Sequence, residues 1–167
     1  MARLLRHRQS RHGSSSSRNY DAQRELRAER KARELLRSVV SPREFAMYEE
    51  LGFLSVDGGQ GPGYAYLIYP HEPIVAYDSL TEELLSEYCV AFPDRDGDDA
   101  SSGARLPNAD DVLAKWIALH GSERELIATA NMHLPGRQLD PERVRRDLLR
   151  SRGWRRPQAA AGEEAAA

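Results

Sequence analysis

Residues 64–92 read YAYLIYPHEPIVAYDSLTEELLSEYCVAF, and this stretch decides the fold. It consists of short runs rich in tyrosine, valine, isoleucine and leucine, separated by prolines and polar residues. Such runs, bounded by turn residues, are typical of β-strands. An earlier run, FLSV at 53–56, leads into the glycine-rich DGGQGPG at 57–63. Together these runs predict an antiparallel meander of three or four strands. The segment at 78–85, DSLTEELL, fits either a helical turn or a hairpin connection.

Helical patterns flank the meander on both sides. We expect helices over 21–40, 42–51, 108–120, 122–131 and 140–154, with a break at Gly121. The second of these begins with a capping box from Ser41 to Glu44 and stops at Gly52, and the fourth begins with a capping box from Ser122 to Glu125. Asn108 or Asp110 is expected to cap the third helix, and Asp140 the last. The apolar spacing places Leu35, Val39 and Ile117 toward the core.

This order of elements predicts an α+β fold, with a small antiparallel sheet packed by N-terminal and C-terminal helices. The sequence of 167 residues suits one domain, which we place at 21–152. Residues 1–20 are rich in arginine and serine and hold no acid. We interpret them as a disordered basic arm, with an organellar targeting segment as the alternative. Residues 153–167 are expected to form a disordered tail.

Charge is strongly segregated along the chain, although the formal net charge is only -2. Residues 1–40 hold 11 basic and 4 acidic side chains, residues 41–136 hold 5 and 17, and residues 137–156 hold 8 and 3. An acidic middle therefore lies between two basic ends. No apolar run approaches the roughly 18 residues of a membrane span. The single cysteine, Cys89, cannot form an internal disulfide, which favours a reducing, cytoplasmic location.

Three features of the sequence resemble ligand-binding motifs, but each lacks residues that the motif requires. The acidic loop at 94–105 lacks the glycine and the final glutamate of a calcium loop in both possible registers. The glycine-rich loop at 57–63 lacks the lysine and hydroxyl of a phosphate loop. The histidines show no metal-ligand spacing. We therefore predict no catalytic residue, cofactor or metal ligand. A small enzyme remains the weakest alternative, and it would need Tyr64, Tyr66, Cys89 and a histidine around one deep pocket.

Basic residues near the N-terminus are the candidate contacts for a nucleic acid, through sequence-independent attraction to phosphates. They are Arg3, Arg6, Arg8, Arg11, Arg18, Arg24, Arg27 and Lys31. Against this hypothesis, the acidic middle of the chain would repel a polyanion. A further alternative is that the basic helices fold onto the acidic middle and neutralise it.

Residues 32–131 resemble an uncharacterised, mainly actinobacterial, small α+β domain family. The similarity rests on ARELLRSVVSPREFAMYEELGFLSV, the tyrosine-rich meander, SEYCVAF, LPNADDVLAKWIAL and the closing IATAN. These motifs concern packing and capping, so the resemblance implies a fold and a compartment but no activity. We predict a small cytosolic, non-enzymatic module whose acidic, sheet-bearing part meets a protein partner. The alternative is a nucleic-acid-associated protein that uses the basic arm.

Overall fold

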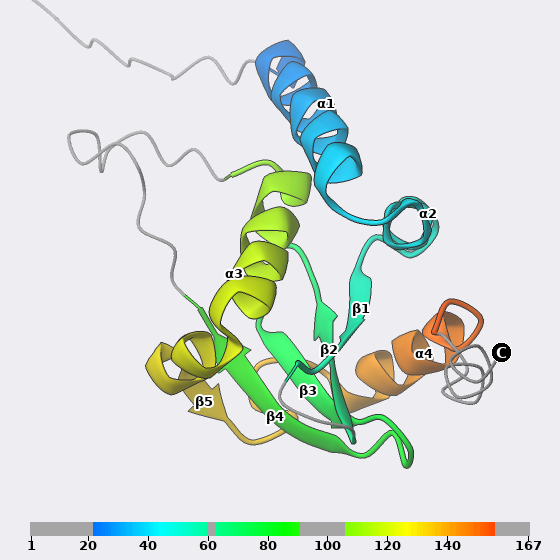
Figure 1. Ribbon diagram of the computed structural model, residues 1–167, viewed down its shortest axis with the longest axis vertical. Helices are drawn as coiled ribbons and strands as arrows, with labels where there is room; N and C mark the ends of the chain where they lie inside the picture. Colours follow the sequence, from blue (N-terminus) through cyan, green and yellow to red (C-terminus); the bar gives the residue numbers. More distant parts are fainter. Residues whose placement is uncertain (1–21, 60–62, 91–105, 156–167) are drawn as a thin grey trace, which may run out of the picture.

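The computed structural model describes residues 22–59, 63–90 and 106–155. There the chain forms the predicted α+β fold, with helices on both faces of an antiparallel sheet (Figure 1). The helices are α1 (Ala22–Val39), α2 (Pro42–Leu51), α3 (Asn108–Thr129) and α4 (Pro141–Ser151). The strands are β1 (Leu54–Asp57), β2 (Tyr64–Ile68), β3 (Ile74–Asp78), β4 (Leu84–Cys89) and β5 (Asn131–His133). The predicted basic arm at 1–20 and the acidic loop at 94–105 lie outside the described residues.

The five strands follow one another in space in the order of the sequence, and every neighbouring pair is antiparallel. The undecided segment after Asp78 is a hairpin connection, because the Asp78 carboxylate accepts hydrogen bonds from the Leu80 and Thr81 amides. The prediction of three or four strands missed β5. This strand has only three residues, too few for an alternating pattern, and it forms by pairing with β4.

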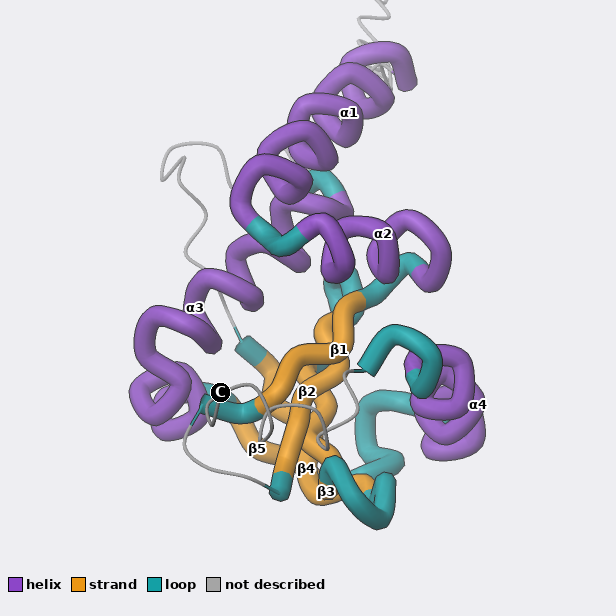
Figure 2. Tube along the Cα trace, turned by 45° about the vertical axis from the view of Figure 1, so that its right-hand side comes forward, coloured by secondary structure: helices purple, strands orange, loops and turns teal. Residues whose placement is uncertain are grey.

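The two faces of the sheet bury separate apolar clusters, because side chains alternate along each strand. On one face, Val56, Tyr66 and Ile68 pack against α1, α2 and α3. On the other, Leu67 and Tyr77 pack against Val144 and Leu148 of α4 and their neighbours. Helix α4 accordingly lies across the sheet from α3 (Figure 2).

The ends of two helices agree with the sequence. Ser41 and Glu44 form the predicted capping box of α2, and Gly52 ends that helix in the left-handed conformation. Asp140 caps α4, since its carboxylate accepts a hydrogen bond from the Glu142 amide. Beyond α4, residues 153–155 belong to the predicted tail but are described, and their carbonyls accept hydrogen bonds from Arg43.

Other details of the helices differ from the predictions. Pro107, not Asn108 or Asp110, occupies the N-cap of α3 and provides no side-chain bond. Helix α3 spans both helices expected at 108–131, and the expected break is present: Ser122, next to Gly121, has non-helical torsion angles that separate two helical segments (φ −158°, ψ 70°). Leu35, Val39 and Ile117 are exposed because each lies one position away from the stripe that faces the core. The first half of α1 projects beyond the sheet (Figure 1).

Candidate functional site

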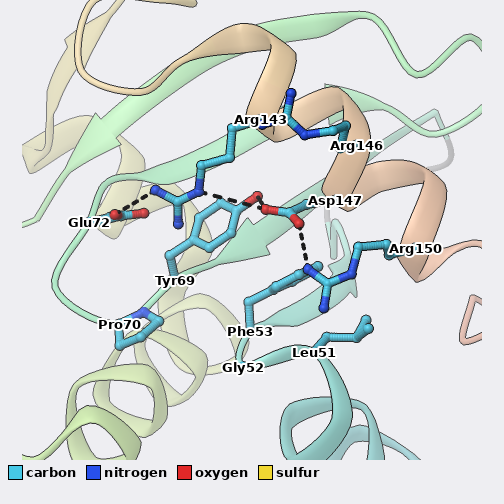
Figure 3. Close-up of a pocket in the computed structure, with 10 residues that line it drawn as sticks. All are labelled: Leu51, Gly52, Phe53, Tyr69, Pro70, Glu72, Arg143, Arg146, Asp147 and Arg150. Atoms are coloured by element: carbon cyan, nitrogen blue, oxygen red, sulfur yellow. Dashed lines mark hydrogen bonds and ion pairs between the residues drawn. The ribbon is translucent and has the colours of Figure 1, made fainter.

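A strongly charged concavity lies between α4, the end of α2 and the turn from β2 to β3 (Figure 3). We call it the arginine hollow. It encloses about 430 Å³, within the range of small-ligand pockets. Its lining residues are Leu51, Gly52, Phe53, Tyr69, Pro70, Glu72, Arg143, Arg146, Asp147 and Arg150.

Three guanidinium groups reach this hollow from one side of α4. Arg143, Arg146 and Arg150 stand at positions i, i+3 and i+7, which share one face of a helix. Val144 and Leu148 point the opposite way into the sheet and fix the rotation of the helix. The arginines therefore lie at the hollow because the apolar stripe of α4 docks as it does.

Two of the arginines are held over aromatic rings. The Arg143 guanidinium carbon lies 5.1 Å from the centre of the Tyr69 ring, and that of Arg150 lies 5.9 Å from the centre of Phe53. Both rings are buried. Cation–π contacts of this kind restrict a side chain that is otherwise flexible. The hollow thus presents the guanidinium groups of Arg143 and Arg150 in fixed positions above two aromatic rings.

Two carboxylates partly neutralise the arginines. Arg143 donates a hydrogen bond to Glu72 at 2.8 Å, and Arg150 donates one to Asp147, also at 2.8 Å. Asp147 is buried and also accepts a hydrogen bond from the Tyr69 hydroxyl at 3.1 Å. Burial and the Asp147 charge raise the pKa of Tyr69, so this hydroxyl stays protonated and donates. One positive charge in the hollow is left over.

Arg146 carries that excess charge. Its side chain is exposed and makes no hydrogen bond or ion pair with any residue that the structure describes. A guanidinium group has five N–H donors, and the two paired arginines each use one of theirs on the acids of the hollow. An incoming anion can therefore be bound without displacing Glu72 or Asp147.

A buried lysine on the far side of the sheet fixes the turn that carries Tyr69 and Glu72. Lys115 of α3 donates hydrogen bonds to the carbonyl oxygens of both residues, each at 2.8 Å. Its third bond goes to Asp111 at 2.6 Å, and Asp111 accepts from the His71 amide at 2.7 Å. The backbone of the turn is thus held from α3, while its side chains hold the arginines of α4.

A second concavity of about 450 Å³ adjoins the break in α3, and we call it the helix-break hollow. Tyr66 and Leu119 form its apolar wall, and Asp57, His120 and Arg124 lie around it. At its base Glu123, which is 6% exposed, accepts hydrogen bonds from the Tyr66 hydroxyl at 2.7 Å and the Gly59 amide at 3.0 Å. Burial and the bond to Glu123 raise the pKa of Tyr66.

The candidate nucleic-acid contacts that the structure describes line neither of the two hollows. Arg24, Arg27 and Lys31 lie exposed on α1, and the other five predicted arginines fall outside the described residues. Of the groups proposed for a small enzyme, Tyr66 lines the helix-break hollow with His120, whereas Tyr64 and Cys89 do not line it. Across the described parts of the chain, no three histidine, cysteine or acidic side chains lie close enough to hold a metal.

The arginines of α4 were not predicted from the sequence to form a site. Their spacing in RVRRDLLR was visible, but the sequence does not show which groups stand opposite them. Ion pairs join the basic C-terminal end to two acids of the acidic middle. Glu72 pairs with Arg143, and Glu82 pairs with Arg152 and Arg155.

Comparisons with known proteins found no matching family model, no similar curated protein and no similar solved structure. The resemblance to an uncharacterised actinobacterial family therefore stays a prediction. Among the described helices, none is both long and apolar enough to cross a membrane.

Proposed function

We propose that the protein is a small, non-enzymatic, cytosolic interaction module that binds an acidic segment of a partner protein in the arginine hollow. The observation that carries the proposal is the array of Arg143, Arg146 and Arg150 on one face of α4, with Arg146 unpaired among the described residues. Guanidinium groups match the planar, two-oxygen geometry of carboxylates better than ammonium groups do.

The surroundings of the array support a binding role. The rings of Phe53 and Tyr69 and the acids Glu72 and Asp147 hold the guanidinium groups of Arg143 and Arg150 before any ligand arrives, which lowers the entropic cost of binding. Each acid already accepts a hydrogen bond from an arginine, so both carboxylates are engaged in holding the array. This arrangement suits recognition better than proton transfer.

The test uses a tetraglutamate peptide with blocked ends, and a tetraglutamine peptide as the uncharged comparison. Binding to the full chain is followed by the amide NMR signals of α4 in about 50 mM and 300 mM salt. We expect saturable binding of the glutamate peptide that weakens with salt. Arg146→Gln should weaken it about tenfold, the value of one charge-assisted hydrogen bond.

Arg145→Gln is the matched control, because Arg145 is exposed on the same helix, pairs with Glu142 and lies outside the hollow. It removes the same charge from the protein and should leave the affinity within about twofold. Equal losses of affinity in Arg146→Gln and Arg145→Gln would mean that binding depends on the net charge of the protein and not on the hollow. Equal binding of the two peptides would contradict the proposal outright.

A second candidate is the nucleic-acid-associated protein of the sequence analysis. It is favoured by the positions of Arg24, Arg27 and Lys31, which are exposed at i, i+3 and i+7 on α1. Binding to duplex DNA and RNA should then fall steeply with salt and disappear when residues 1–30 are deleted. Affinity that is independent of salt, or that survives the deletion, would reject it.

A further inference from the structure

The base of the helix-break hollow is rich in hydrogen-bond acceptors. Glu123 accepts two hydrogen bonds, from Tyr66 and Gly59, although a carboxylate offers about four acceptor positions. The Tyr66 hydroxyl donates to Glu123, so its own lone pairs remain available. The hollow therefore has buried acceptor capacity that these protein donors do not use.

A third acceptor comes from the histidine beside the break. His120 Nδ1 lies 2.8 Å from the Trp116 carbonyl oxygen, which can only accept, so Nδ1 carries the proton. In the neutral ring Nε2 is then an acceptor. The ring stacks on Trp116 with its centre 3.9 Å away, which fixes its orientation.

We propose that the helix-break hollow binds a primary ammonium group at the end of an alkyl chain. A protonated amine has three donors and no acceptor, which matches the free acceptor positions of Glu123 and Tyr66 at the base, with the exposed His120 at the edge of the hollow. Leu119 and the Tyr66 ring provide an apolar wall for the alkyl stem. The two acids of the hollow, Asp57 and Glu123, outweigh the single positive charge of Arg124.

The same acceptors argue against an anion, since both carboxylates would repel it at close range. An ammonium group is also small enough to approach a buried carboxylate, whereas a guanidinium group is planar and wider. Two sources carry this chemistry: a lysine side chain of a protein, and a free polyamine. The proposal is independent of the arginine hollow, which lies across the sheet.

The test titrates the ¹⁵N-labelled full chain with three probes. They are a blocked Gly-Lys-Gly peptide, the same peptide acetylated on the lysine amine, and spermidine. We expect the unmodified peptide to shift the amide signals of Gly59, Ser122 and Glu123 saturably, and the acetylated peptide to leave them unchanged. Tighter binding of the peptide identifies lysine as the ligand, and tighter binding of spermidine identifies a polyamine.

Glu123→Gln keeps the shape of the side chain and removes its charge; its amide oxygen can accept from the Gly59 amide and its NH2 can donate to the Tyr66 hydroxyl, so binding should weaken about tenfold or more without loss of the local contacts. If this variant does not fold, Asp57→Asn at the exposed rim tests the same attraction between a carboxylate and the ammonium group. It should lower the affinity about twofold. Glu125→Gln, on the exposed side of the same helix, should change nothing. Equal binding of the acetylated peptide, or an unchanged affinity in both hollow variants, would overturn the proposal.

Discussion

Replacing Lys115 by methionine is expected to destabilise the protein by about 3–5 kcal/mol, the typical result of removing one partner from a buried ion pair. Lys115 is 3% exposed and Asp111 is 8% exposed, so water reaches neither group freely. The substitution keeps most of the side-chain volume but removes the bonds to Asp111 and to the carbonyls of Tyr69 and Glu72. Asp111 would be left with the His71 amide.

A loss of this size is a large part of the roughly 5–15 kcal/mol by which domains are stable. Urea unfolding followed by circular dichroism measures it. The matched control is Lys31→Met, because Lys31 is the other lysine of the chain and is exposed on α1. It should change the free energy of unfolding by less than about 0.5 kcal/mol.

The double variant Asp111→Leu with Lys115→Met separates charge burial from lost packing. Because it removes both charges, it should recover at least about 1 kcal/mol relative to Lys115→Met alone. Lys115→Met should also weaken binding in the arginine hollow, since it releases the turn that positions Tyr69 and Glu72. A destabilisation below about 1 kcal/mol, or a double variant no better than the single one, would refute the reasoning.

Three further predictions concern stability. The hydrogen bond from Arg152 helps to lower the pKa of Glu82 to about 2. The stabilisation from this carboxylate is therefore complete above about pH 4.5 and is lost as the pH falls toward 2. In Glu82→Gln, the unfolding temperature should fall less steeply over this pH range. Gly136→Ala should cost about 1–2 kcal/mol in urea unfolding, because Gly136 has φ 83° and a Cβ would lie 2.9 Å from the Pro141 ring; an unchanged midpoint would contradict it. Ser41→Ala should lower the free energy of unfolding by about 0.5–2 kcal/mol, because it removes the cap of α2. An equal loss in Ser38→Ala, at an exposed serine that does not cap the helix, would contradict this explanation.

The sequence predicted the fold well where local chemistry decides the structure. The tyrosine-rich meander and the caps of α2 and α4 follow from residue types and spacings within a few positions of one another. It failed where a distant partner decides. Strand β5 exists because β4 offers it an edge.

The candidate sites show the same division. Asp111 and Lys115 stand at i and i+4, a spacing common in exposed helix pairs, and only the packing of α3 on the sheet buries them. The arginine spacing on α4 was readable, but the two aromatic rings and Glu72 that face it come from segments about 70 or more residues earlier in the chain. The sequence pattern therefore indicated which arginines share one face of α4, but not which residues from other segments contact them.

The order of elements along the chain also has a consequence for biosynthesis. Strands β1 to β4 pair in sequence order, so this meander can form from local contacts while later residues are still being synthesised. Helix α4 leaves the ribosome after all five strands and supplies every arginine of the hollow. A nascent chain lacking α4 has no such array, so capture of an acidic partner through it must follow translation of this last helix.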